Sequence, residues 1–206
     1  MKRCVIVGGA KIENYGRVKS HLKPSDFMIY CDGGLKHMEA LEATPDLIVG
    51  DFDSFENPNL PVETISLPCE KDDTDTIFAV KEAMKRGFDE YLLIGVVGER
   101  LDHTLGNVYA LLMLDSNGRH GAIVDDYSVM EIVSDGTAYV NDRCSYFSLI
   151  NISGTARGIM VKNAKYPLEN AEITPEYQYG ISNETLPGKT AEITVKEGRM
   201  LLIKVY

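Results

Sequence analysis

The sequence predicts an α/β domain followed by an all-β domain. From residue 1 to about residue 126, short apolar runs rich in Val and Ile alternate with segments of helical periodicity. From residue 127 onward, short strands follow one another with turn signals between them, and no segment has a helical pattern. The first pattern is typical of a mostly parallel sheet covered on both faces, and the second of an antiparallel sandwich or barrel. We therefore expect a mostly parallel α/β sheet domain at residues 1–126 and an antiparallel β-sandwich at residues 127–206.

The first half contains the strands and helices expected of such a sheet. The strands are near-continuous apolar runs, and they begin at Cys4, Phe27, Asp46, Val62, Tyr91 and Gly121. The helical segments repeat apolar residues every three to four positions, and they cover residues 35–43, 74–87 and 101–118. The last two helices end at Gly87 and Gly118, and glycine is the residue most often found just after a helix end.

The second half contains only short apolar strands. They cover residues 128–136, 137–140, 146–154, 156–164, 191–198 and 199–206. The sequences SDG, NISG and KEG end three of these runs and are typical of hairpin turns. We therefore expect the chain to turn at each of them.

Charge and composition exclude several classes of function. The formal net charge of −10 would repel a phosphate backbone, so no nucleic-acid partner is expected. The first apolar run breaks at Gly8 and is too short for a secretion signal, and no apolar run is long enough to cross a membrane. The four cysteines lack metal-binding spacing and lie in or beside apolar segments, so we expect them to be reduced and buried. These features indicate a cytoplasmic protein with no membrane partner.

Acidic residues gather at the ends of the expected strands of the first half. They are Asp32 after the second strand, Asp51 and Asp53 after the third, Asp72, Asp73 and Asp75 before the second helix, and Asp102 after the fifth strand. In open α/β sheets, ligands bind outside the carboxyl ends of the strands. We therefore expect these carboxylates to line one site.

The sequence LIVGDFDSF, residues 47–55, is the most informative of these strand ends. In an extended chain the side chains alternate, so Asp51 and Asp53 would point the same way and Phe52 toward the core. Two carboxylates directed at one point repel each other unless a cation lies between them. Mg²⁺ prefers oxygen ligands and is usually bound by one or two carboxylates together with substrate phosphates. The pair therefore predicts a magnesium site and a phosphorylated substrate.

Neighbouring polar residues fit a phosphorylated substrate. Arg100 could bind a phosphate through two parallel hydrogen bonds, and His103 follows it closely. Thr74 and Ser54 offer hydroxyl groups at helix or turn starts, where backbone N–H groups also face anions. No nucleotide-binding P-loop, G-x-G-x-x-G, G-x-S-x-G or H-E-x-x-H motif is present.

Several of the acids also have a purely structural interpretation. Asp72 or Asp75 could cap the helix that begins near Thr74, and Asp102 could cap the following helix. Asp32 precedes two glycines and could be an ordinary turn residue.

Four segments together resemble the thiamine pyrophosphokinase family. They are CDGGL (31–35), GDFDS (50–54), KDDTDT (71–76) and GERLDHTLGN (98–107), in the same order and at similar intervals. Residues 149–170 and GISNET (180–185) are similar to the β-domain of that family, so the resemblance covers essentially the whole chain. It departs from the family pattern at Glu99, where a glycine is common.

The resemblance implies that a diphosphate group is transferred from ATP to the hydroxyl of thiamine, giving thiamine diphosphate and AMP. It implies a homodimer with active sites between subunits, and Mg²⁺ bound by Asp51, Asp53 and Asp75. These three acids would be catalytic, together with Arg100, Asp102 and His103. The residues implied for ATP are Asp32, Gly33, Gly34, Ser54, Asp72, Thr74 and Asn107, and those implied for thiamine are Ser182 and Asn183. The chain has no tryptophan to pack against thiamine as in some family members, so Tyr177 or Tyr179 is expected to replace it.

Two other functions stay open on the residues alone. A metal-dependent phosphohydrolase could use the Asp51/Asp53 pair, with Asp51 as the nucleophile, because D-x-D at a strand end also occurs in aspartyl-phosphate phosphatases. A sensor could bind ATP or thiamine without turnover. The segments DDTDT and RLDH and the expected β-sandwich favour the transferase.

Overall fold

The computed structural model describes residues 2–52, 59–70 and 72–206. The chain divides into two compact units, Met1–Asp126 and Tyr127–Tyr206. The sequence pattern changes at this same boundary, from alternating helices and strands to strands alone.

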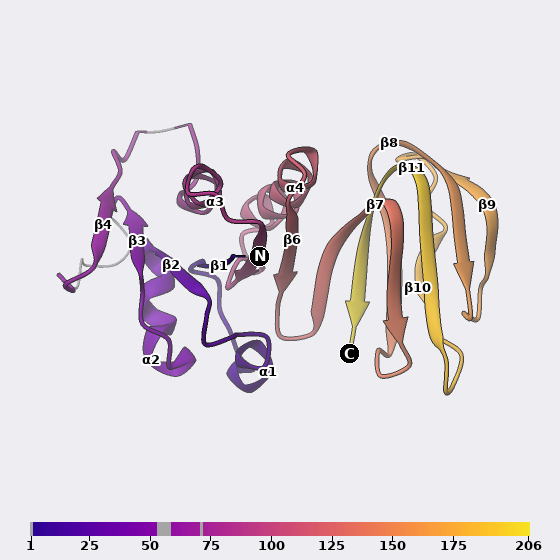
Figure 1. The fold of residues 1–206 in the computed structure, drawn as a ribbon, viewed down its shortest axis with the longest axis horizontal. Helices are drawn as coiled ribbons and strands as arrows, with labels where there is room; N and C mark the ends of the chain where they lie inside the picture. The colour runs from indigo at the N-terminus through magenta and orange to yellow at the C-terminus, as the bar shows by residue number, and fades with distance from the viewer. Residues whose placement is uncertain (1, 53–58, 71) are drawn as a thin grey trace. The chain divides into compact units, whose positions relative to one another are not determined.

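In the described part of the first unit, six parallel strands form a sheet in the order β4-β3-β2-β1-β5-β6 (Figure 1). The strands are β1 (Arg3–Val7), β2 (Phe27–Cys31), β3 (Leu47–Gly50), β4 (Glu63–Ser66), β5 (Glu90–Ile94) and β6 (His120–Val124). The central strands are buried along nearly their whole length, which explains their continuous apolar sequences. The parallel sheet expected from the sequence is confirmed.

Helices cover both faces of this sheet. They are α1 (Tyr15–Lys19), the 3-10 helix η1 (Asp32–His37), α2 (Met38–Leu41), α3 (Asp75–Lys85) and α4 (Leu101–Ser116). In Figure 1, α1 and α2 lie on one face of the sheet, and α3 and α4 lie on the other. The chain leaves β1 toward β2, β3 and β4, and later returns to place β5 and β6 on the other side of β1. The carboxyl ends of β1 and β5 are therefore the switch point at which ligands of such sheets bind.

The helices expected from the sequence are found on one face of the sheet, whereas those on the other face differ from expectation. The segments 74–87 and 101–118 form α3 and α4, and the glycines that follow them have φ of 79° and 66°. The helix expected at residues 35–43 has the wrong bounds. The helical region already begins at Asp32 with the 3-10 helix η1, and α2, which follows it, ends at Leu41. Helix α1 was not expected, since it has only five residues, and the side chain of Asn14 caps it.

Glycine is required at Gly34, where η1 passes over the end of β1. A Cβ atom at this position would lie 2.1 Å from the carbonyl oxygen of Val7. Such a contact cannot form without displacing backbone, so the missing side chain lets η1 approach the sheet.

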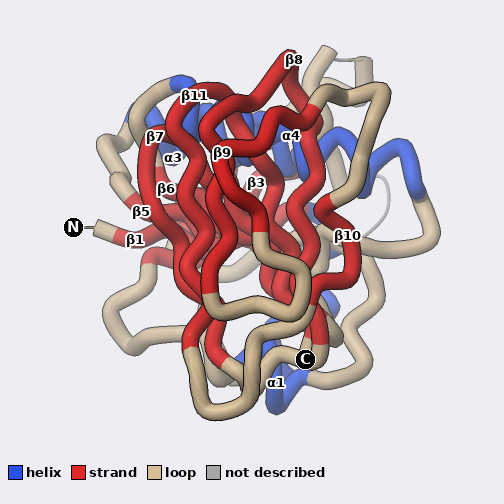
Figure 2. Tube along the Cα trace, turned by 90° about the vertical axis from the view of Figure 1, so that its right-hand side faces the viewer, coloured by secondary structure: helices blue, strands red, loops and turns tan. Residues whose placement is uncertain are grey.

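The second unit consists of antiparallel strands. They are β7 (Ser128–Asn141), β8 (Tyr146–Lys162), β9 (Leu168–Ile173), β10 (Gly180–Asn183) and β11 (Thr190–Val205). The turns expected at SDG, NISG and KEG are wrong, because these sequences lie inside the strands β7, β8 and β11. Figure 2 shows these three as long strands. Asp135, Gly154 and Gly198 adopt positive φ there, and the pairing register shifts near Gly198. The strands bend at these points and continue.

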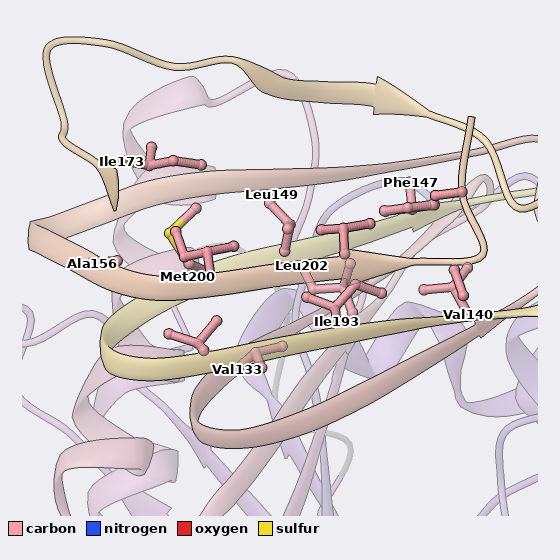
Figure 3. Packing of buried hydrophobic residues seen from close by; sticks show 14 of the residues in the cluster. Val133, Val140, Phe147, Leu149, Ala156, Ile173, Ile193, Met200 and Leu202 are labelled. Atoms are coloured by element: carbon pink, nitrogen blue, oxygen red, sulfur yellow. The ribbon is translucent and has the colours of Figure 1, made fainter. Parts of the chain in front are cut away.

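Because the long strands bend, the two halves of one strand belong to different layers of the sandwich. Residues 146–150 of β8 pair with β10 and with the end of β11, whereas residues 156–162 pair with β9 and with the start of β11. Buried side chains from both halves form one cluster, including Val133, Phe147, Leu149, Ile193 and Leu202 (Figure 3). The β-sandwich expected from the sequence is confirmed, and its two layers share their long strands.

Three of the four cysteines are buried as expected: Cys4, Cys31 and Cys144. The expectation is wrong for Cys69, which is exposed in the segment after β4. Across the described residues, every helix is too short or too polar to cross a membrane.

Substitution of Gly34 by alanine should destabilise the protein. The Cβ atom would force η1 away from the carbonyl group of Val7, so Gly34→Ala should lower the free energy of unfolding by about 1–3 kcal/mol. Urea unfolding followed by circular dichroism measures this change.

Gly106 is the matched control. It is exposed inside α4, and an added Cβ atom meets nothing within 4 Å. Gly106→Ala should therefore raise stability by about 0.5–1 kcal/mol through helix propensity. Equal effects of the two substitutions would contradict the close approach at Gly34.

Candidate active site

A cleft of about 510 Å³ opens at the carboxyl edge of the sheet in the first unit. Its walls come from the segment after β1, from η1, from the start of α3 and from the segment that joins β5 to α4. It therefore lies at the switch point between β1 and β5, where the doubly wound topology predicts a ligand site.

Three carboxylates meet at this edge of the sheet. Asp32 begins η1, Asp51 follows β3, and Asp75 lies in the first turn of α3. One oxygen atom from each lies within 4.8 Å of the others, with Asp32 buried and the other two half-buried. Gly50 makes room for this arrangement, because a Cβ atom there would lie 2.7 Å from the Cβ of Asp32. Acids from segments far apart in the sequence thus lie close together in the fold.

The chemistry of this group suits a hard divalent cation. Carboxylates this close repel one another, and a cation bound between them removes the repulsion. Oxygen atoms are the ligands that Mg²⁺ prefers, and substrate phosphates commonly complete its coordination. Asp32, Asp51 and Asp75 are therefore the described residues that could hold a metal ion.

Phe52 does not continue the extended chain expected for LIVGDFDSF, so that prediction is wrong. The residue is half-buried and has φ of 59°, so the chain leaves the extended conformation directly after Asp51. Alternation along a strand therefore does not apply to Asp51 and Asp53. Asp53 and Ser54 lie outside the described residues.

The acids before α3 do not cap this helix. The hydroxyl of Thr74 caps it instead, by accepting a hydrogen bond of 3.3 Å from the backbone N–H of Ile77. Asp73 pairs with Lys81 at 2.6 Å, and Asp72 is exposed outside the cleft lining. Asp75 is thus the acid of this segment that reaches the cleft, in the helix turn where a negative charge is most favourable.

The segment between β5 and α4 supplies the opposite wall. Arg100 and His103 line the cleft, and Arg100 pairs with Asp102 at 2.7 Å on the surface. The hydrogen bonds from Arg100 hold the pKa of the Asp102 carboxyl well below its usual range. Asn107 also lines the cleft, and its side-chain nitrogen donates to the carbonyl oxygen of Val96 at 2.9 Å. Asp102 thus contacts Arg100 rather than capping α4.

Cys31 directly precedes Asp32 but is not a candidate nucleophile. Burial raises the pKa of its thiol to about 12, and the nearby carboxylate of Asp75 adds to this effect. The thiol therefore stays protonated at neutral pH, and thiols react as thiolates.

Part of the cleft was missed by the sequence analysis. Gly9, Ala10 and Lys11 follow β1 and line the cleft beside Gly33, and Lys36 of η1 donates a hydrogen bond to the carbonyl oxygen of Gly9. The segment lacks a glycine-rich nucleotide motif, and only its place after the central strand could have identified it. Gly34 is absent from the lining, and its role in the structure is the close approach to β1.

The second unit contains its own hollow, of about 410 Å³. Tyr166, Tyr179 and Ser182 line it over a floor that includes Leu149. The buried side chain of Asn183 accepts a hydrogen bond of 3.0 Å from the backbone N–H of Tyr166 and donates one of 2.7 Å to its carbonyl oxygen. Asn183 thus fixes the segment that carries Tyr166.

Of the two tyrosines expected beside a ligand, Tyr179 lines the hollow and Tyr177 does not. Tyr177 is 70% exposed and packs against Tyr179 with ring centroids 5.3 Å apart. Tyr166 was not singled out from the sequence, because its place in the hollow depends on a hydrogen-bond partner 17 residues away.

Two family models match most of the chain. The model described as "Thiamin pyrophosphokinase, catalytic domain" matches residues 18–121, and "Thiamin pyrophosphokinase, vitamin B1 binding domain" matches residues 138–200. The first range contains the three clustered acids, and the second contains the hollow beside Tyr166.

Known proteins and solved structures agree with these matches. A thiamine pyrophosphokinase of Bacillus subtilis is 26% identical over 163 residues, which cover 75% of this chain and 76% of that protein. The crystal structure of the thiamine pyrophosphokinase from Bacillus subtilis aligns with a TM-score of 0.87 at 23% identity, over 100% of this chain and 99% of that one. The one from Geobacillus thermodenitrificans aligns with a TM-score of 0.84 at 28% identity, over 99% and 97%.

Proposed function

The chain belongs to the thiamin pyrophosphokinase family, and we propose that it transfers a diphosphate group from ATP to the hydroxyl of thiamine. The products are thiamine diphosphate and AMP. The observation that carries this proposal is the group of Asp32, Asp51 and Asp75 at the mouth of the sheet, within the range matched by the catalytic-domain model.

We propose that Asp32, Asp51 and Asp75 bind Mg²⁺, with Asp53 as a further ligand implied by the family resemblance. When bound, the ion would neutralise the phosphate oxygens of ATP and hold them in place. The close spacing of the three carboxylates supports this assignment, because it places three of the oxygen ligands that Mg²⁺ prefers around one point.

Basic residues around the cleft suit the phosphates. Arg100 is exposed at the cleft and can exchange its bond with Asp102 for a phosphate, and its planar guanidinium matches two phosphate oxygens. Lys36 and His103 line the same cleft, and the ammonium group of Lys36 can also attract phosphate oxygens. Phosphoryl-type transfer depends mainly on positioning and on charge stabilisation, which these residues supply.

The reaction requires in-line attack of the thiamine hydroxyl oxygen on the β-phosphorus of ATP. A new oxygen–phosphorus bond forms, the bond from the β-phosphorus to the oxygen that bridges the α- and β-phosphates breaks, and AMP leaves with that oxygen. The hydroxyl proton passes to a carboxylate of the cleft.

The other residues implied for ATP take different parts in this proposal. Asp32, Gly33 and Asn107 line the cleft. Gly34 lets η1 pack closely on β1 beside the cleft, and Thr74 caps the start of α3. Ser54 lies outside the described residues, and Asp72 does not line the cleft.

We propose that thiamine contacts the hollow of the second unit. Tyr166 and Tyr179 present aromatic rings there, and a ring of this kind attracts a cation such as the thiazolium of thiamine. Ser182 is exposed at the hollow and can contact the ligand, whereas Asn183 holds Tyr166 in place. The description of the matched vitamin B1 binding domain supports this assignment.

We also propose a cytoplasmic homodimer with active sites between subunits. Leu101, Leu105 and Tyr109 recur every four residues on α4 and are 66%, 49% and 53% exposed. Residues at this spacing share one face of a helix, so they form an exposed apolar stripe beside the cleft. A second copy of the chain would cover it.

The phosphohydrolase and the ligand sensor are not favoured, because both matched family models belong to a diphosphate transferase. The assay that separates them mixes the protein with ATP, thiamine and Mg²⁺. AMP and thiamine diphosphate should form in equal amounts. Release of inorganic phosphate without a thiamine ester would indicate the hydrolase, and binding without AMP would indicate the sensor.

Asp75→Asn should lower kcat/KM in this assay by about 100-fold or more, since it removes a carboxylate proposed to bind the Mg²⁺ that would hold the phosphates. Asp135→Asn is the control, because Asp135 is an exposed residue of the second unit with φ of 39°, a conformation that asparagine tolerates. Near-normal turnover by a folded Asp75→Asn protein would contradict the assignment.

Light scattering coupled to size exclusion tests the homodimer. The unmodified protein should have the mass of two chains, and Leu105→Glu should shift it toward one chain because a charge replaces the centre of the apolar stripe. Ser116→Glu, at the exposed end of the same helix, should leave the mass unchanged. A monomeric unmodified protein would contradict the dimer.

A further inference from the structure

A buried histidine that the proposed reaction does not use lies behind the cleft. His37, the last residue of η1, is only 2% exposed. Its Nε2 atom lies 2.8 Å from the carbonyl oxygen of Ala10, and its Nδ1 atom lies 2.7 Å from the hydroxyl oxygen of Tyr15. The ring therefore joins three segments: η1, α1 and the segment after β1.

These partners determine the protonation of the ring. The carbonyl oxygen of Ala10 can only accept, so Nε2 carries the proton and donates. In the neutral ring Nδ1 is then an acceptor, and the hydroxyl of Tyr15 donates to it. Burial lowers the pKa of His37, which favours the neutral form at neutral pH.

The carbonyl group that His37 holds belongs to the wall of the cleft. On the side of β5, the backbone N–H of Ala10 donates to the carbonyl oxygen of Gly95 at 2.7 Å. On the side of η1, His37 holds the carbonyl oxygen of the same residue, and the exposed Lys36 contacts Gly9. Both polar groups of Ala10 are thus engaged, and the rigid, buried ring fixes the second of them.

The far end of this segment is held independently. The carboxylate of Asp126 accepts hydrogen bonds from the backbone N–H groups of Glu13 at 2.9 Å and Asn14 at 2.7 Å. Asn14 in turn caps α1, the helix whose first residue is Tyr15. Between the hydrogen bond to Gly95 at one end and the hydrogen bonds to Asp126 at the other, His37 holds the carbonyl group of Ala10.

We propose that His37 is a positioning residue for the nucleotide: its neutral ring, oriented by Tyr15, fixes the wall formed by Gly9, Ala10 and Lys11 in the shape that binds ATP. This inference rests on the proposed function, since ATP is taken as the ligand of the cleft. His37 does not line the cleft, so it acts through Ala10 rather than by touching the substrate.

Three variants separate positioning from simple packing. His37→Leu removes both hydrogen bonds, whereas His37→Gln keeps a side-chain nitrogen that can donate to Ala10. Tyr15→Phe keeps the aromatic ring and removes only the donor to Nδ1. A role in packing alone predicts similar results for the leucine and glutamine variants.

The first measurement is the ¹⁵N spectrum of the His37 ring at neutral pH. The unmodified protein should show a neutral ring with the proton on Nε2. A proton on Nδ1, or a charged ring, would overturn the proposal. This result does not depend on catalysis.

The second measurement is affinity for an ATP analogue with a methylene group between the α- and β-phosphates, in the presence of Mg²⁺. Loss of the hydrogen bond to Ala10 should weaken binding by about 3- to 10-fold in His37→Leu. His37→Gln should restore most of the affinity, and the affinity of Tyr15→Phe should lie between those of His37→Leu and the unmodified protein. The KM for thiamine should stay within about twofold of the unmodified value in all three variants.

Amide hydrogen exchange of Ala10 completes the test without any nucleotide. Exchange should be faster in His37→Leu than in the unmodified protein and largely restored in His37→Gln. Unchanged exchange and affinity in a folded His37→Leu protein would overturn the proposal. If the unmodified protein binds no ATP analogue, the proposed function fails, while the ring proton and the Ala10 exchange still decide the positioning role.

Discussion

Repulsion among three carboxylates is the constraint on which the site depends. Asp32, Asp51 and Asp75 bring their oxygen atoms within 4.8 Å of one another, and in water such charges would separate. The fold holds them because Asp32 follows β2, Asp51 follows β3 and Asp75 begins α3. Gly50 at the end of β3 allows this approach, since any side chain at this position would meet Asp32. The packing of the sheet thus maintains an arrangement that a cation would stabilise.

Much of this arrangement could be predicted because it depends on local patterns. Continuous apolar runs identified the parallel strands, and parallel strands bring their carboxyl ends to one edge. Acids placed after those strands, such as Asp32 and Asp51, therefore had to be near one another. Helices α3 and α4 were predictable for a similar reason, since each has apolar residues at helical spacing and a glycine just beyond its C-cap residue.

The rest depends on contacts between distant residues, which no local pattern records. The long strands β7, β8 and β11 continue through turn-like sequences because strand pairing before and after each bend outweighs the local preference of residues such as Gly198. The segment after β1 acquires its shape from His37 and Asp126, far along the chain. Phe52, two residues after β3, has a positive φ that ends the alternation of side chains, and its residue type does not indicate this conformation.

Direct measurement of metal binding tests the central claim, that the three acids form one cation site. Titration of the unmodified protein with Mn²⁺ in place of Mg²⁺, followed by electron paramagnetic resonance, should show bound ion. Asp32→Asn and Asp51→Asn should each weaken binding by about 10-fold or more, while Asp135→Asn should bind as the unmodified protein does. Wild-type affinity in both of the folded cleft variants would contradict a shared cation site.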